Sequence, residues 1–260
     1  MMLDGKRLLI TGVATPESIA TAVAMRCRDL GAEVVLSAYP RDLDGVRAVA
    51  ADLLGGAPVL SLDVTDPRDV ARAVEDVRRD IGALDGALHA VAYAPPDALQ
   101  GRLGDADPDG VELAFRTSAW SFSALGGLLE STAPPSGGSL VGLDFDADDR
   151  AWPTYNWMGV CKAALRSSAR YLARDLGPRH IRVNLVAAGP LRTRAASAIP
   201  GFELLTGAWA STAPMPWDPT DPAPVADATC FLLSDLARAV TGEVLHVDAG
   251  FHAMATTRPD

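Results

Sequence analysis

Tyr155 and Lys162 lie seven positions apart at the start of an apolar, alanine-rich run. Seven residues is about two turns of an α-helix, so both side chains would point the same way if this run is helical. A phenol beside an ammonium can form a proton-donating pair, because the positive charge favours the phenolate and the ammonium can hold a hydroxylated ligand. Most such pairs on helices are surface residues. This pair therefore indicates a catalytic site only if the rest of the chain predicts a fold that places it in one.

The elements that would position the pair follow from an alternation of short β-rich runs with longer helical patterns. Strands are expected at residues 7–11, 33–37, 58–62, 86–92, 139–143, 181–186 and 244–247. Helices are expected at residues 18–30, 42–54, 67–81, 108–131, 155–177 and 223–234. The alternation predicts a doubly wound, Rossmann-like α/β fold, with one parallel sheet of about seven strands and helices on both faces.

No linker, repeat or low-complexity tract divides the chain, so residues 1–260 are interpreted as a single dinucleotide-binding and catalytic domain. Residues 187–222 show no regular pattern and are too many for a simple connection. Loops of that length are usually lids or binding segments, so we expect residues 194–221 to form a short substrate-binding lid.

The charge and composition exclude several classes of function. Of the 260 residues 48% are apolar, which suffices for a large core, and the net charge of −10 argues against a nucleic-acid partner. No apolar run approaches the roughly 20 residues needed to span a bilayer, and a strand-like segment so near the start leaves no room for a signal peptide. We therefore expect a cytoplasmic protein without a membrane partner. Neither the three cysteines nor the four scattered histidines have metal-ligand spacing, so no metal site is expected.

The first strand-to-helix turn is the expected phosphate site of such a fold. It lacks the second and third glycines of the dinucleotide fingerprint, yet Gly12 allows a close turn of the backbone. Ser18 and Ile19 stand at the expected start of the helix, where free amides and the helix dipole favour an anion. An ordinary turn with Ser18 as the N-cap is the alternative.

The ends of the second and third strands offer contacts for a nucleotide. Tyr39 could pack against adenine, and Arg41 leaves a 2′-phosphate possible, because no carboxylate follows the second strand to bind a ribose diol. These residues leave the choice between NADH and NADPH open. Asp63 and Val64 could contact the adenine amino group and ring, although an N-cap role for Asp63 is an alternative.

Each of two further groups of residues, one apolar and one basic, has two possible interpretations. Large apolar side chains around the Tyr155 helix and the late loop could line an apolar pocket or form plain core: Trp152, Trp157, Met158, Trp209, Met215 and Trp217. Basic residues also repeat at i, i+4 spacing from Lys162 through Arg166, Arg170 and Arg174. For the three arginines we favour a solvated or subunit-facing stripe over an anion site.

Together these residues resemble the enoyl-acyl-carrier-protein reductases of the short-chain dehydrogenase/reductase superfamily, especially those of mycolate synthesis. The resemblance spans nearly the whole chain. Its specific signals are the turn from Gly12 to Ser18-Ile19-Ala20 and the spacing of six residues between Tyr155 and Lys162. Ordinary members of the superfamily have lysine four positions after the tyrosine, where this chain has Gly159.

The resemblance implies hydride transfer from NADH to a trans-2-enoyl thioester carried by acyl carrier protein or coenzyme A. Tyr155 would hydrogen-bond the thioester oxygen, Lys162 would bind the nicotinamide ribose, and Phe145 would contact substrate or nicotinamide. Cofactor contacts are implied for Gly12, Ser18, Ile19, Tyr39, Asp63, Val64, Ala90, Ala92, Lys162, Pro190, Leu191 and Thr193. A homotetramer built through the helices after Pro108 and Tyr155 is also implied, and Arg192 and Arg194 are candidates for meeting an acidic carrier.

The chain departs from the family pattern at three places. Ala92 stands where relatives place a glycine against the cofactor, and the loop at residues 94–100 differs. The segment from Thr193 to Pro214 is shorter than in the long-chain mycolate enzyme, which predicts short- or medium-chain substrates. Two alternatives stay open: a specialised relative that reduces another C=C, C=N or C=O bond or catalyses a non-redox cyclisation, and a cofactor-binding sensor or scaffold without turnover.

Overall fold

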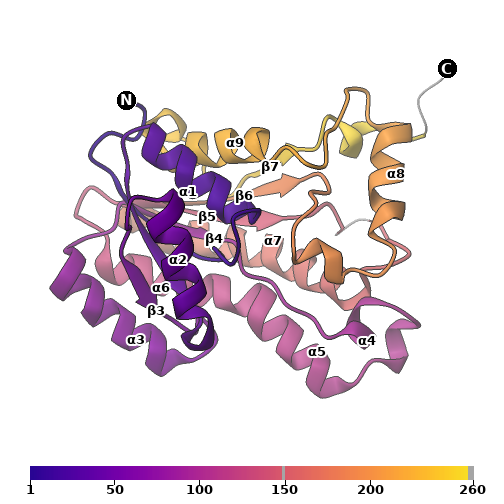
Figure 1. Cartoon of the computed structure of the whole chain (residues 1–260), viewed down its shortest axis with the longest axis horizontal. Coiled ribbons are helices and arrows are strands. Elements are labelled where there is room, and N and C mark those ends of the chain that lie inside the picture. The colour runs from indigo at the N-terminus through magenta and orange to yellow at the C-terminus, as the bar shows by residue number, and fades with distance from the viewer. Residues whose placement is uncertain (148–149, 257–260) are drawn as a thin grey trace.

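A computed structural model describes residues 1–147 and 150–256. In this part of the chain one parallel sheet has the strand order β3-β2-β1-β4-β5-β6-β7 (Figure 1). The strands are β1 (Arg7–Ile10), β2 (Glu33–Ala38), β3 (Val59–Ser61), β4 (Gly86–His89), β5 (Gly138–Asp144), β6 (Ile181–Ala188) and β7 (Val244–Val247). The α-helices are α1 (Ile19–Asp29), α2 (Leu43–Leu53), α3 (Pro67–Asp76), α4 (Pro96–Leu99), α5 (Pro108–Phe115), α6 (Ser121–Thr132), α7 (Asn156–Leu176), α8 (Phe202–Thr212) and α9 (Ala223–Leu233).

The sheet is buried between two layers of helices because both faces of its strands are apolar. Leu8 and Ile10 of β1 belong to a core shared with α1, α2 and α9, whereas Leu9 belongs to a second core with α3, α6 and α7. Figure 1 shows these two layers on opposite sides of the sheet. The doubly wound α/β fold with about seven parallel strands is therefore confirmed.

The helix expected at residues 108–131 is interrupted by a wider π turn at Arg116–Trp120 between α5 and α6. Side chains at this turn bond to the segment that follows β4. Ser118 Oγ donates to the Tyr93 carbonyl at 3.1 Å and accepts from the Tyr93 amide at 3.0 Å. Periodicity alone gives no sign of this interruption, since the apolar pattern continues through it.

The stretch expected to be irregular contains α8, an 11-residue helix. Its apolar positions Phe202, Leu205 and Trp209 have the spacing of one helix face, a signal that the sequence carried. Gly201, with φ of +70°, precedes the helix. None of the helices described within residues 1–147 and 150–256 is long and apolar enough to cross a bilayer.

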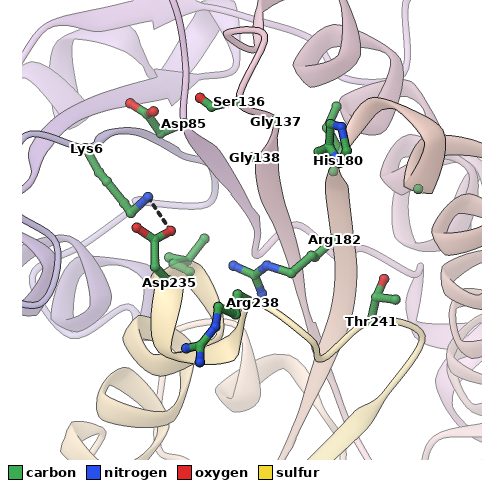
Figure 2. A pocket seen from close by; sticks show the side chains of 13 residues that line it. Lys6, Asp85, Ser136, Gly137, Gly138, His180, Arg182, Asp235, Arg238 and Thr241 are labelled. Atoms are coloured by element: carbon green, nitrogen blue, oxygen red, sulfur yellow. Dashed lines mark hydrogen bonds and ion pairs between the residues drawn. The ribbon is translucent and has the colours of Figure 1, made fainter.

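A cavity of about 460 Å³ lies at the amino ends of β4, β5 and β6 (Figure 2). Its charged side chains are engaged in holding the fold together. Lys6 forms an ion pair with Asp235 at 2.8 Å, and Arg182 donates to the carbonyls of Leu232 and Ser234 at the end of α9. The candidate site residues lie at the opposite, carboxyl edge of the sheet.

Candidate active site

The turn between β1 and α1 packs closely on the segment that follows β4. Gly12 has φ of +84°, and a Cβ there would collide with the carbonyl of Ala90. The Ala90 amide donates to Thr11 Oγ1 at 3.1 Å. Only glycine suits both this backbone conformation and this close approach. The missing glycines of the fingerprint therefore do not prevent a tight turn.

Ser18 stands at the N-cap position of α1, and its side chain shapes the preceding turn. Its hydroxyl accepts hydrogen bonds from the amides of Ala14 at 3.3 Å and Thr15 at 3.0 Å, and its side chain makes no capping bond to the helix. The first turn of α1, beginning at Ile19, contains no acidic residue. The alternative that places Ser18 at the N-cap is thus confirmed in position, without a side-chain capping bond, and the amino end of α1 also suits the diphosphate of a dinucleotide.

The carboxyl ends of β2 and β3 bring the adenine candidates to the same edge. Tyr39 is exposed, and the Arg41 guanidinium lies 5.0 Å from the centre of its ring. Asp63 accepts from the Thr65 amide at 2.8 Å and from the Thr65 hydroxyl at 2.6 Å, which closes a turn. The N-cap of α3 is Asp66, so the N-cap alternative for Asp63 is wrong. Val64 beside it is buried.

The remaining cofactor candidates follow β4 and β6. β4 ends at His89, earlier than expected, so Ala90 and Ala92 lie beyond the sheet, and Ala92 is exposed. Pro190 and Leu191 are buried, and the Pro190 carbonyl accepts from Trp217 Nε1 at 2.9 Å. Thr193 Oγ1 accepts from the Ala196 amide at 3.1 Å, which fixes the start of the segment that leads to α8.

Tyr155 precedes α7 and is not part of it. Its φ of 170° is extended, and α7 begins at Asn156. The expectation that Tyr155 and Lys162 share a helix face two turns apart is therefore wrong in detail. Tyr155 is only 8% exposed. Burial, with the nearby Asp144 charge, raises the pKa of Tyr155, so the expected shift toward phenolate is also wrong, because desolvation of the phenolate dominates.

Lys162 is buried beside the end of β5, and its Nζ donates to the Leu143 carbonyl at 2.8 Å. Burial lowers the pKa of Lys162, while the carboxylate of Asp144 opposes that shift. Burial, reinforced by the Lys162 charge, lowers the pKa of His89 to about 3, so this histidine is neutral near pH 7. Its Nε2 lies 2.8 Å from Ser121 Oγ. No motif in the sequence singles out His89.

Arg166, one turn beyond Lys162 on α7, is buried. Its Nε donates to Asp144 Oδ2 at 2.6 Å and its Nη2 to Asp146 Oδ1 at 3.0 Å. The expected solvated or subunit-facing position is therefore wrong for Arg166, because α7 turns this side chain toward the end of β5. Arg170 and Arg174 are exposed. Neither aspartate had been singled out as a partner of α7.

The charged network continues from Asp146 toward the C-terminal segment. Asp146 Oδ2 lies 3.4 Å from Arg150 Nη2, and its Oδ1 lies 3.4 Å from His246 Nε2. The His246 ring stacks on His252 at 3.9 Å, and His252 Nδ1 lies 3.1 Å from Asp248. In the described part of the chain, no group of three histidine, cysteine, aspartate or glutamate side chains is placed to hold a metal ion.

Aromatic rings from four other segments pack together, and one of them, Phe145, contacts Tyr155. We call them the aromatic cluster: Phe145, Trp152, Tyr155, Trp209 and Phe251. Phe145 lies 5.0 Å from Tyr155 and 5.6 Å from Trp209 between ring centres. Trp209 stacks on Phe251 at 3.8 Å and lies 5.5 Å from Trp152. These rings form one apolar body beside the phenol.

The remaining large apolar residues that the sequence singles out as pocket or core do not all lie in the aromatic cluster. Met158 is buried with the aromatic cluster, and Trp217 packs partly against it. Trp157 donates from Nε1 to the Leu103 carbonyl at 2.9 Å, and Met215 is 65% exposed. The core alternative therefore suits Trp152, Met158 and Trp209, whereas Met215 belongs to neither a core nor a pocket.

Comparison with known proteins gives one consistent result. A family profile described as enoyl-(acyl carrier protein) reductase matches residues 12–252, which include every site residue considered above. The NADH enoyl-[acyl-carrier-protein] reductase of Mycolicibacterium smegmatis is 39% identical, with 96% of this chain and 97% of that protein aligned. The protein of the same name from Rickettsia felis is 35% identical, with 99% and 98% aligned. That of Aquifex aeolicus is 37% identical, with 97% and 93% aligned.

Proposed function

Because this chain belongs to the enoyl-(acyl carrier protein) reductase family, we propose that it is an NADH-dependent enzyme that reduces the C=C bond of trans-2-enoyl thioesters. The observation that carries the proposal is the position of Tyr155. Its phenol is buried against Phe145 at the carboxyl edge of the sheet, the same edge at which Gly12 and the amino end of α1 suit a dinucleotide.

When bound, NADH supplies the hydride that adds to the β-carbon of the enoyl group. Negative charge then develops on the thioester oxygen, where a positioned donor stabilises it. Tyr155 suits that role because its raised pKa keeps the phenol protonated. Lys162 would hold the ribose hydroxyls next to the nicotinamide, and Phe145 would limit how substrate approaches the reacting face.

We propose that residues 194–221 form the substrate-binding lid and that the substrates have short or medium acyl chains. The lid contributes α8, and Trp209 of α8 is inserted into the aromatic cluster beside Tyr155. An acyl chain that extends past Tyr155 must pass or displace these rings. A closely packed aromatic wall therefore limits the length of chain that the lid can cover.

The carrier of the acyl group would meet the enzyme beside this lid. Arg192 forms a two-point ion pair with Glu203, with N–O distances of 2.7 and 2.9 Å, so its charge is already compensated. Arg194 is exposed and is the better candidate for an acidic acyl carrier protein. Coenzyme A thioesters would need no such contact.

We also propose a cytoplasmic homotetramer. The outer faces of α5 and α7 expose the apolar side chains Leu113, Phe115, Val160 and Tyr171, which subunit contacts would cover. Both helices lie in the layer that the family resemblance assigns to subunit contacts. Measuring the molecular mass in solution by light scattering tests this, and a monomer would contradict it.

The activity is tested by following NADH absorbance with trans-2-enoyl thioesters, and the roles by two substitutions. Tyr155→Phe should lower kcat about 100-fold while the NADH Kd stays within about twofold, because it removes one donor to the developing charge. Lys162→Ala should raise the NADH Kd about tenfold or more. Arg170→Ala is the matched control at an exposed position of α7. The reverse pattern would overturn the two roles, and no oxidation of NADH by the unaltered enzyme would overturn the proposed function.

A further inference from the structure

A buried arginine connects two buried carboxylates to the helix that carries Lys162. The Arg166 side chain is 8% exposed, and those of Asp144 and Asp146 are 0% and 6% exposed. Arg166 holds Asp144 by its Oδ2, at 2.6 Å, whereas Asp144 Oδ1 is buried without a hydrogen-bond partner in the described residues. This arrangement leaves one oxygen of Asp144 without a hydrogen bond, on the residue that follows the Leu143 carbonyl bound by Lys162.

Lys162 and Asp144 meet at the end of the same strand. The lysine ammonium donates to the carbonyl of Leu143, the residue before Asp144, and the Asp144 charge acts on it strongly enough to oppose the effect of burial. An ammonium has three donors, so Lys162 can turn toward a carboxylate as well as toward a ribose. The direction in which it turns depends on how fully Asp144 is already compensated.

We propose that Arg166 is a positioning residue for Lys162: by pairing with Asp144, it leaves the lysine ammonium free to bind the ribose of the cofactor. The inference rests on the proposed function, since it concerns the same cofactor. Lys162 and Arg166 are the two cations that act on Asp144, so without Arg166 the lysine is drawn onto the carboxylate oxygen that has no hydrogen bond. Binding of the ribose then requires this new ion pair to break.

The contacts of the two aspartates distinguish a positioning role for Arg166 from a role in stability alone. Arg166 reaches both Asp144 and Asp146, and Asp146 also has Arg150 and His246 at 3.4 Å. Loss of Arg166 therefore leaves Asp146 with Arg150 as a cationic neighbour. The consequence for Asp144 falls on Lys162, which no surface arginine of α7 can influence in the same way.

The test compares NADH binding, measured by isothermal titration calorimetry without substrate, in matched variants of the full chain. Arg166→Met keeps the apolar stem and removes the charge, Arg166→Lys restores the charge, and Arg170→Met makes the same change one turn further along α7 at an exposed position. Arg166→Met should raise the NADH Kd about tenfold, with kcat at saturating NADH within about twofold. Arg166→Lys should recover most of the affinity, and Arg170→Met should match the unaltered protein.

Adding Asp144→Asn to Arg166→Met removes the competing charge and should recover NADH binding as well. An equal Kd for Arg166→Met and Arg170→Met, a fall in kcat alone, or no recovery in the double variant would overturn the inference. If Arg166→Met does not fold, the comparison is between Asp144→Asn and the double variant. The inference requires these two to bind NADH with the same Kd, and a higher Kd for the double variant would contradict it. If the unaltered protein neither binds NADH nor reduces enoyl thioesters, the proposed function itself has failed.

Discussion

Replacing Trp209 with leucine should shift the preferred substrate toward longer acyl chains. Trp209 is only 1% exposed and stacks on Phe251 at 3.8 Å, with Phe145 and Trp152 at 5.6 and 5.5 Å. Leucine keeps an apolar surface against these rings and vacates most of the space of the indole. That space adjoins the phenol of Tyr155 through Phe145, so it can receive the distal part of an acyl chain.

The magnitude follows from the number of methylene groups that the space can bury. If two more methylenes leave water, each contributes about 0.8 kcal/mol, or about 1.6 kcal/mol together. This corresponds to a rise of about 15-fold in kcat/KM for the longer chain relative to the shorter one. The substitution should also lower the free energy of unfolding by about 2–4 kcal/mol, since it removes buried contacts and the 3.0 Å bond from Trp209 Nε1 to the Asp248 carbonyl.

The assay is kcat/KM for a series of thioesters from crotonyl to dodecenoyl, with thermal unfolding measured alongside. Trp120→Leu is the matched control, because Trp120 is 37% exposed and lies outside the aromatic cluster. An unchanged chain-length profile in a folded Trp209→Leu variant would refute the reasoning that this wall limits the acyl chain. A uniform loss of activity across the series would refute it equally.

Two further predictions concern the packing beneath the site. Gly12→Ala should lower the free energy of unfolding, measured in urea, by about 3 kcal/mol, whereas the control Gly5→Ala should lower it by about 1 kcal/mol. Both glycines have positive φ, but only Gly12 has a carbonyl in the path of a Cβ. Equal losses would contradict the close approach of Gly12 to Ala90. The pKa of His89 is lowered to about 3 in the folded protein, below the ordinary value of 6.5. As the pH falls, the unfolded chain therefore takes up this proton before the folded protein does. The free energy of unfolding should then fall by about 1.4 kcal/mol per pH unit from pH 6.5 toward pH 3. His89→Gln should remove that slope and exposed His180→Asn should not; a slope unchanged by His89→Gln would show that other groups cause it.

The sheet and the close turn after its first strand were predictable because their signals are local. Strand residues such as Leu8, Leu9 and Ile10 are apolar without alternation, which is typical of a strand buried on both faces. Gly12 stands directly after the first strand, where a close turn is needed. Neither inference requires knowledge of what lies opposite in space, so the fold class followed from the sequence alone.

The site was less predictable because its properties depend on partners distant in the sequence. Asp144 and Arg166 are 22 positions apart and belong to a strand and a helix. The i, i+4 series of basic residues looks the same whether one of them faces solvent or the end of β5. The pKa of Tyr155 likewise depends on burial by other segments, which reverses the direction expected from a neighbouring ammonium.

The cost of burying charge explains why the Asp144–Arg166 pair points to the site and not merely to the fold. Taking two charges out of water is unfavourable, and well-packed apolar side chains of similar volume often stabilise a core as well or better. A pair that served only packing could therefore be apolar. Asp144 follows Leu143, whose carbonyl binds the ammonium of Lys162, and a carboxylate there opposes the lowering of the lysine's pKa by burial. That carboxylate needs a second cation to keep it from holding the lysine, and Arg166 is the side chain that α7 places on it.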